Sequence, residues 1–131
     1  MANNNEELVQ GLIRDGYLKT PLIIEAFQKI DRKEFVPETT KETAYANEPL
    51  PIGYGQTISQ PLTVALMFEW LAPKQNEKIL DIGCGSGWTT AMLAYIVTHE
   101  IFDLDAANVN PKVIGIERIP ELAEMAKANV N

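Results

Sequence analysis

The sequence predicts an α/β fold in which N-terminal helices precede a βαβα unit with parallel strands. Three observations lead to this prediction. Apolar residues recur at helical spacing near the N-terminus, a short apolar run at residues 78–82 leads into a glycine-rich turn, and a second apolar run at residues 113–117 follows another helical segment. A strand, a turn, a helix and a second strand form a crossover unit, and the two strands of such a unit are parallel.

Two helices are predicted before residue 31. The first ends near Gly16, and its apolar positions are Leu8, Val9, Leu12 and Ile13. The second has Thr20 as its expected N-cap and Pro21 as its first helical residue. Its apolar face is formed by Ile23, Ala26, Phe27 and Ile30. We expect both helices to serve packing, because such apolar faces usually cover a core.

The segment from Pro37 to Pro61 is predicted to be an ordered loop. Prolines and glycines interrupt regular structure throughout it, while its larger side chains give it something to bury; these are Tyr45, Leu50, Ile52 and Tyr54. A connection of this length in a small domain is commonly functional, and ordered long loops often carry sites.

The remaining elements are a helix from Pro61, a buried strand at 78–82, a helix at about 88–97, a strand at 113–117 and a helix at about 120–129. The helix from Pro61 is expected to end before Pro73. Its predicted apolar face is Val64, Met67, Phe68 and Leu71, and that of the last helix is Leu122, Met125 and Ala126.

The turn at residues 81–87 is the strongest chemical signal in the sequence. Glycines between a strand and a helix let a ligand approach the main chain, where free N–H groups favour electron-rich groups. The spacing is D-x-G-x-G-x-G rather than the dinucleotide pattern G-x-G-x-x-G. It resembles motif I of class I methyltransferases, which have a Rossmann-like fold. That resemblance implies S-adenosylmethionine as the cofactor, held by Asp81, Gly83, Gly85, Ser86 and Gly87.

Glu117, at the end of the second strand, is the expected partner of this turn. A carboxylate there can accept hydrogen bonds from both ribose hydroxyls of an adenosine. The alternative is a solvated charge at a strand end. Together with the glycine turn, Glu117 favours a nucleoside cofactor.

A narrower resemblance lies in the block L-P-I-G-Y-G-Q-T-I-S-Q-P at residues 50–61. It is similar to the signature of protein-L-isoaspartate (D-aspartate) O-methyltransferases. Residues 35–37, 44–45 and 116–122 extend the likeness over nearly the whole chain. The resemblance implies methylation of the free carboxylate of isoaspartyl and D-aspartyl residues in damaged proteins. The ester then collapses to a succinimide, which begins repair.

The same resemblance assigns residues of the block. Ser59 corresponds to the family's active-site serine, and Gln56, Thr57 and Ile58 lie with it along the cofactor and substrate cleft. Ser59 also precedes a helix start, where free N–H groups can hold a carboxylate. Alternatively, Ser59 is a capping residue without chemistry.

We expect one domain over residues 1–131, with the N-terminal helices and substrate loop at 1–76 and the cofactor-binding βαβα unit at 77–131. The family continues through several more strands, so we expect a C-terminally truncated domain with an open parallel edge and uncovered apolar faces. A fragment of a longer product is favoured over a piece completed by another chain and over a degenerate relic.

Other functions are less well supported. The net charge of −7, from 11 Lys and Arg against 18 Asp and Glu, argues against nucleic-acid binding. No apolar run suits a membrane span, the N-terminus lacks a signal pattern, and one cysteine permits no internal disulfide. These features predict a cytoplasmic protein. Another class I methyltransferase, or a non-catalytic cofactor-binding module, remain the alternatives; a NAD-dependent oxidoreductase is disfavoured by the glycine spacing.

Three further features receive simple interpretations. Cys84 is expected to fill a tight turn, and His99 to be an ordinary loop residue, because no base is evident for a cysteine nucleophile. Residues 98–112 lengthen the connection to Glu117 and are interpreted as a surface insertion. The oxygen-bearing residues there lack the spacing of an EF-hand metal loop; they are Asp103, Asp105, Asn108 and Asn110.

Overall fold

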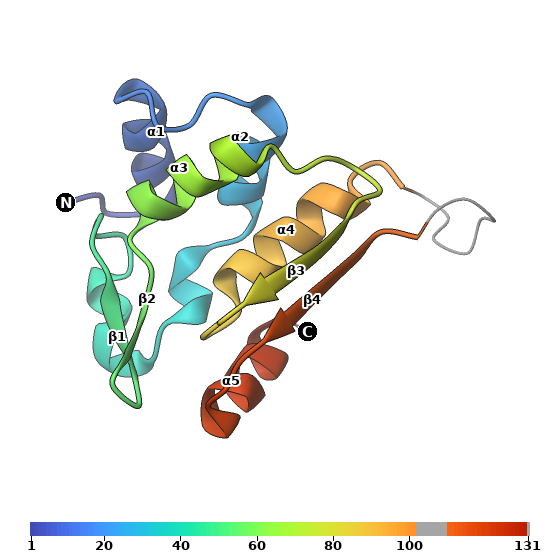
Figure 1. The fold of residues 1–131 in the computed structure, drawn as a ribbon. Helices are drawn as coiled ribbons and strands as arrows, with labels where there is room; N and C mark the ends of the chain where they lie inside the picture. Colours follow the sequence, from blue (N-terminus) through green and yellow to red (C-terminus); the bar gives the residue numbers. More distant parts are fainter. Residues whose placement is uncertain (102–109, 131) are drawn as a thin grey trace.

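The computed structural model describes residues 1–101 and 110–130 of the chain (Figure 1). Its elements, in chain order, are α1 (Asn5–Arg14), α2 (Pro21–Lys29), the 3-10 helices η1 (Arg32–Phe35) and η2 (Glu38–Thr43), β1 (Leu50–Gly53), β2 (Gln56–Ile58), α3 (Pro61–Leu71), β3 (Lys78–Ile82), α4 (Trp88–Thr98), β4 (Lys112–Ile116) and α5 (Pro120–Val130). Every helix and strand expected from the sequence is therefore present.

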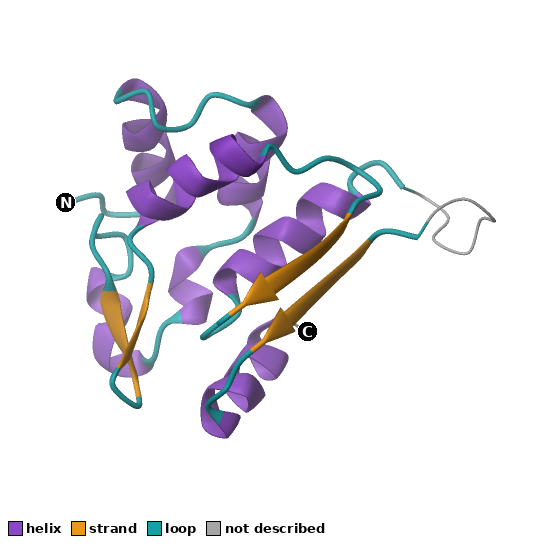
Figure 2. Cartoon of the chain, viewed as in Figure 1, coloured by secondary structure: helices purple, strands orange, loops and turns teal. Residues whose placement is uncertain are grey.

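The predicted βαβα unit is confirmed. β3 and β4 are parallel neighbours, with Lys78 opposite Lys112 and Ile82 opposite Ile116. Figure 2 shows α4 lying along one face of this pair. Gly115 permits the close approach, since a Cβ at that position would lie 2.7 Å from Oγ1 of Thr90 on α4. Both strands run toward the same end of the unit, where the glycine turn lies.

Helix α4 joins the two halves of the chain into one core. Its buried positions include Trp88, Met92 and Ile96. The ring of Phe27, on α2, packs edge-on against Trp88 at 5.6 Å and against Phe68 of α3 at 5.9 Å. Edge-to-face rings at these separations are a favourable aromatic geometry. The glycine turn thus stands on a core shared with the N-terminal helices.

The position expected for the start of α2 is right, but its capping is not. Thr20 is the N-cap residue, yet its side chain makes no capping hydrogen bond. Its hydroxyl instead donates to Glu69 of α3 at 2.6 Å, and the same carboxylate accepts the backbone N–H groups of Lys19 and Thr20, each at 2.8 Å. One oxygen of Glu69 accepts both N–H groups, one of which is the free N-cap N–H of α2, so a carboxylate from another helix caps α2.

The predicted ordered loop contains a β-hairpin. β1 and β2 are antiparallel, with Leu50 opposite Ile58. Tyr54 and Gly55 form the turn with positive φ angles of 58° and 70°. The sequence analysis did not expect strands here, because Pro51 and the neighbouring glycines weaken strand propensity. Burial of alternate side chains on β1 stabilises the hairpin against the core.

Some residues predicted to be buried are exposed. On α3, Met67 is 58% exposed and Leu71 57%, because the helix directs Val64, Ala65 and Phe68 inward instead. On β3, Leu80 is 56% exposed and Ile82 74%. The strand at 78–82 is therefore not the buried strand expected: α4 covers one face, and no described element covers the other.

Candidate functional site

The glycine turn lies at the carboxyl end of β3 and is fastened to β4. The N–H groups of Gly83 and Cys84 both donate to the carbonyl of Ile116, at 2.8 and 3.0 Å. Gly83 and Gly85 have φ angles of 74° and 55°, a region that L side chains rarely adopt. A Cβ at Gly83 would meet nothing within 4 Å, so the backbone there faces open space.

Glu117 closes the other side of this turn. Its Oε2 accepts the N–H of Gly85 at 2.9 Å, and its Oε1 accepts the N–H of Ile119 at 3.1 Å. The hydrogen bond from Ile119 does most to lower the pKa of the Glu117 carboxyl below its usual range, and that from Gly85 adds to it against an opposing effect of burial. The backbone of Arg118 also lowers the pKa of this carboxyl. Glu117 is therefore ionised at neutral pH.

Two adjoining cavities connect Glu117 with Ser59. The larger, of about 460 Å³, is lined by Gln56, Ile82, Gly83, Ile116, Glu117, Arg118 and Ile119. The smaller, of about 40 Å³, is lined by Thr57, Ile58, Ser59, Gly83, Cys84, Gly85, Ser86, Trp88 and Thr89. Gly83 belongs to both. Residues 56–59, residues 83–86 and Glu117, which were predicted to act together, line these two neighbouring cavities, called the cleft below.

Ser59 follows β2 directly and is exposed at the edge of this cleft. Its carbonyl oxygen accepts a hydrogen bond from Arg32 at 3.1 Å. The free N–H groups expected at the start of α3 are only partly available, because the N–H of Leu62 donates to Oδ1 of Asn47 at 2.9 Å. The start of α3 thus has fewer free N–H groups to bind a carboxylate than the sequence indicated.

Two predicted cofactor residues lie outside the two cavities. Asp81 uses Oδ2 to accept the hydroxyls of Thr89 and Thr90, each at 2.7 Å, and so ties β3 to the first turn of α4. Gly87 has α5 packed against it, since a Cβ there would lie 2.8 Å from Cγ2 of Val130. Gly87 packs against α5, whereas Asp81 lines a third cavity, of about 620 Å³, together with Ser59, Gly83 and Thr89.

Ser86 lines the smaller cavity but is only 2% exposed. Its Oγ has no hydrogen-bond partner among the described residues. A buried hydroxyl without a partner is unfavourable, so a ligand with a polar group suits this end of the cleft.

Cys84 and His99 do not form a nucleophile and base. Burial raises the pKa of the Cys84 thiol, and the nearby carboxylates of Asp81 and Glu117 raise it further, which disfavours a thiolate. His99 lies at the other end of α4, with Nε2 3.7 Å from Glu25. Both residues keep the simple interpretations that the sequence favours.

Of the suggested insertion, Asp103, Asp105 and Asn108 lie outside the described residues. Within residues 1–101 and 110–130, no group of three or more His, Cys, Asp and Glu side chains is arranged to hold a metal ion. Nor does any helix in that part of the chain combine the length and apolar character that crossing a membrane requires.

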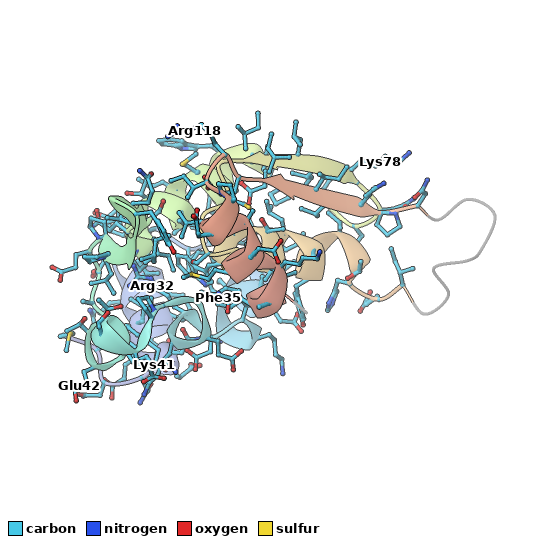
Figure 3. All side chains as sticks on the ribbon, turned by 90° about the horizontal axis from the view of Figure 1, so that it is seen from below. Arg32, Phe35, Lys41, Glu42, Lys78 and Arg118 are labelled. Carbon is cyan, nitrogen blue, oxygen red and sulfur yellow. The ribbon has the colours of Figure 1, made fainter. Side chains whose placement is uncertain are left out.

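Arg32 is the residue of this region that the sequence analysis missed. It is 0% exposed, and its guanidinium donates to four backbone carbonyls, including that of Ser59. Figure 3 shows Arg32 within the molecule, whereas Lys78 and Arg118 lie at its edge. The burial of Arg32 could not be predicted from the sequence, because arginine side chains are mostly exposed.

Comparison with known proteins agrees with this geometry. The family model of protein-L-isoaspartate(D-aspartate) O-methyltransferases matches residues 3–131. A protein-L-isoaspartate O-methyltransferase of Methanopyrus kandleri is 43% identical over 125 residues, which are 95% of this chain and 51% of the relative. One from Ignicoccus hospitalis is 42% identical over 127 residues, covering 97% of this chain and 56% of the relative.

A solved structure has the same fold. The crystal structure of a Plasmodium falciparum protein described as a protein-L-isoaspartate O-methyltransferase, in complex with S-adenosyl-L-homocysteine, superposes with a TM-score of 0.83 at 28% identity. The match covers 98% of this chain and 56% of that one. The chain spans about half the length of the curated relatives it matches. Its helices and parallel strand pair form part of the Rossmann-like methyltransferase fold predicted from the sequence. The chain belongs to the protein-L-isoaspartate(D-aspartate) O-methyltransferase family.

Proposed function

We propose that the residues lining the cleft bind S-adenosylmethionine and present it to the free carboxylate of isoaspartyl and D-aspartyl residues in damaged proteins. The observation that carries the proposal is the pair of neighbouring cavities that share Gly83, one lined by Glu117 and the other by Ser59, with Gly85 donating a hydrogen bond to Glu117. In this division of labour, residues 1–76 provide the substrate side and residues 77–131 the cofactor side. We propose the cytoplasm as its location, where a lone cysteine stays reduced.

The residues of the cleft suit the cofactor. Glu117 is ionised, and its carboxylate is an acceptor suited to the two vicinal hydroxyls of a ribose. The open backbone at Gly83 leaves room for a ligand to lie across the turn. The complex of the Plasmodium falciparum relative with S-adenosyl-L-homocysteine supports the same choice.

The predicted residues Gln56, Thr57 and Ile58 form the opposite wall. They come from β2, whose register against β1 is fixed by the pairing of Leu50 with Ile58. Asp81 would act indirectly: by holding Thr89 and Thr90 it orients the start of α4, where Ser86 and Gly87 stand. We therefore propose positioning roles for Asp81 and Gly87, and direct contacts for the other predicted residues.

Little acid–base chemistry is needed for this reaction. When bound, S-adenosylmethionine would supply a methyl group on a sulfonium sulfur: a carboxylate oxygen attacks the methyl carbon, the carbon–sulfur bond breaks, and the products are a methyl ester and S-adenosylhomocysteine. An isoaspartyl carboxylate is already ionised at neutral pH, so no general base has to remove a proton. The chain's own contribution is to align the acceptor and to exclude water, as rate enhancement by positioning requires. Ser59 would donate its hydroxyl hydrogen bond to that carboxylate.

The resulting ester would collapse to a succinimide, which can reopen as a normal aspartyl link. A radiolabelled methyl assay tests the proposal with a matched pair of peptides, one with an isoaspartyl residue and the other with aspartate at the same position. Label should enter the isoaspartyl peptide alone. Equal labelling of both peptides, or of neither, would contradict the proposed substrate. Binding of S-adenosylhomocysteine without any transfer would favour a cofactor-binding module instead.

A further inference from the structure

We propose that Arg32 is a positioning residue, which fixes Ser59 and the end of β2 against the first turn of α4. In doing so it sets the separation between the substrate-side serine and the cofactor-side glycine turn. The catalytic consequence rests on the function proposed above, whereas the structural consequence can be measured without it.

The guanidinium of Arg32 gathers backbone carbonyls from two separate segments. Nη1 donates to Ala44 at 2.7 Å and to Ala46 at 3.0 Å. Nη2 donates to Glu48 at 2.9 Å and to Ser59 at 3.1 Å. One side chain therefore binds both the chain before the hairpin and the residue directly after it.

The face of the same guanidinium lies over the ring of Trp88, with Cζ 5.3 Å from the ring centroid. Trp88 is the first residue of α4, directly after the glycine turn, and is 2% exposed. Trp88 and Ser59 also line the same small cavity. Arg32 thus links the two sides of that cavity, through a hydrogen bond to the carbonyl of Ser59 and a cation–π contact with Trp88.

The arrangement depends on the shape of arginine as well as on its charge. Arg32 is fully buried and forms no ion pair with any described carboxylate. A buried cation is costly unless hydrogen bonds satisfy it. Hydrogen bonds satisfy Nη1 and Nη2 of the guanidinium, while Nε has no hydrogen-bond partner among the described residues. A lysine ammonium directs only three donors, tetrahedrally, and has no flat face for an aromatic ring. Burial lowers the pKa of Arg32 to about 10, so the side chain remains charged at neutral pH.

The test compares Arg32→Lys with Arg14→Lys in the full chain. Arg14 is an exposed arginine on α1 whose nearest ion-pair partner is Asp15, and it serves as the matched control. Hydrogen exchange followed by mass spectrometry reports on residues 44–60, with α1 as the internal reference. Methyl transfer to the isoaspartyl peptide is measured on the same variants.

In Arg32→Lys we expect the rate of amide hydrogen exchange in residues 44–60 to rise about tenfold, because the hydrogen bonds to that segment are lost. The exchange rate in α1 should not change. The kcat should fall by about tenfold or more while the KM for S-adenosylmethionine is unchanged, as expected for a misplaced substrate side. Arg14→Lys should change neither measurement.

Unchanged protection of residues 44–60 in a folded Arg32→Lys protein would overturn the proposal, as would faster exchange spread evenly over the whole chain. If Arg32→Lys does not fold, Trp88→Phe replaces it, since phenylalanine keeps an aromatic face with a weaker cation–π contact. That variant should loosen residues 44–60 to a smaller extent, and unchanged protection would again contradict the role. Absence of methyl transfer in the wild-type chain would refute the proposed function alone, because the exchange experiment still decides the role of Arg32.

Discussion

The backbone N–H of Gly85 donates a hydrogen bond to Oε2 of Glu117 at 2.9 Å, across 32 residues of sequence. The carbonyl of Ile116 adds two more hydrogen bonds to the same turn. The chain's own hydrogen bonds thus hold the glycine bend and the strand-end carboxylate in register. A site assembled in advance spends less of its binding free energy on ordering.

Glu117→Gln tests the carboxylate of this pair. Glutamine retains the size of the side chain but loses the charge and one acceptor oxygen, so S-adenosylhomocysteine should bind about 10- to 100-fold more weakly, as expected for a lost charge-assisted hydrogen bond. Isothermal calorimetry measures the affinity. Glu121→Gln, on the exposed first turn of α5, is the control and should bind normally. Equal affinities of the two variants for S-adenosylhomocysteine would show that the Glu117 carboxylate does not contribute to binding.

Ser59→Ala tests the substrate side. The substitution removes the hydroxyl but keeps the backbone carbonyl that Arg32 binds. Methyl transfer to an isoaspartyl peptide should fall by about 10- to 100-fold, because a hydrogen bond to a charged group is lost, while affinity for S-adenosylhomocysteine is retained. Thr63→Ala, at an exposed position on α3, is a suitable control. Full turnover in the Ser59 variant would leave that residue without a role in transfer.

Gly115→Ala tests the contact between β4 and α4. The new methyl group would lie 2.7 Å from Oγ1 of Thr90 and 3.1 Å from Sγ of Cys84, so the free energy of unfolding should fall by about 1–3 kcal/mol. Gly11→Ala makes the same change inside α1, where the nearest atom is 3.6 Å away. It should raise stability by about 0.5–1 kcal/mol. Urea denaturation measures the free energy of unfolding of both variants. If both substitutions raised it, or both lowered it, the result would contradict this packing.

Glu69→Gln tests the carboxylate that caps α2. Burial alone would raise the pKa of Glu69, but hydrogen bonds from Thr20 and Lys19 outweigh it and hold the pKa below the ordinary value of 4.5. A carboxyl whose folded-state pKa is lowered stabilises the protein above its unfolded-state pKa, and this stability is lost as the pH falls through the folded-state value.

At pH 7 the free energy of unfolding of the wild type should therefore be about 1 kcal/mol higher than that of Glu69→Gln. This value takes into account that the Glu69 side chain is partly exposed to solvent. The difference should shrink as the pH falls below 4.5. A difference that is constant between pH 7 and pH 3, in urea denaturation, would mean that the charge of Glu69 does not stabilise the cap.

The sequence predicted the order of the elements well, because each signal was local. Pro21 and Pro61 mark helix starts, and both helices begin there. The parallel pairing of β3 with β4 followed from the crossover helix between them. The same reasoning placed Gly83, Gly85 and Glu117 at one edge of the sheet, which is where the structure brings them together.

What the sequence missed depends on tertiary contacts. The burial of Arg32 requires four carbonyls and one aromatic ring to converge, and no local pattern encodes that convergence. Leu80 and Ile82 read as buried because they are apolar, but burial needs a covering element that a strand's own composition does not specify. The packing of α5 against Gly87, which excludes a side chain there, could not be predicted for a similar reason.

The most direct measurement is an amide NMR titration of the isotopically labelled chain with S-adenosylhomocysteine. The account predicts that the largest chemical-shift changes fall in residues 56–59, 83–87 and 117–119, which border the cleft or form its turn. No change at saturating ligand, or changes gathered instead around Glu25 and His99 at the far end of α4, would contradict it.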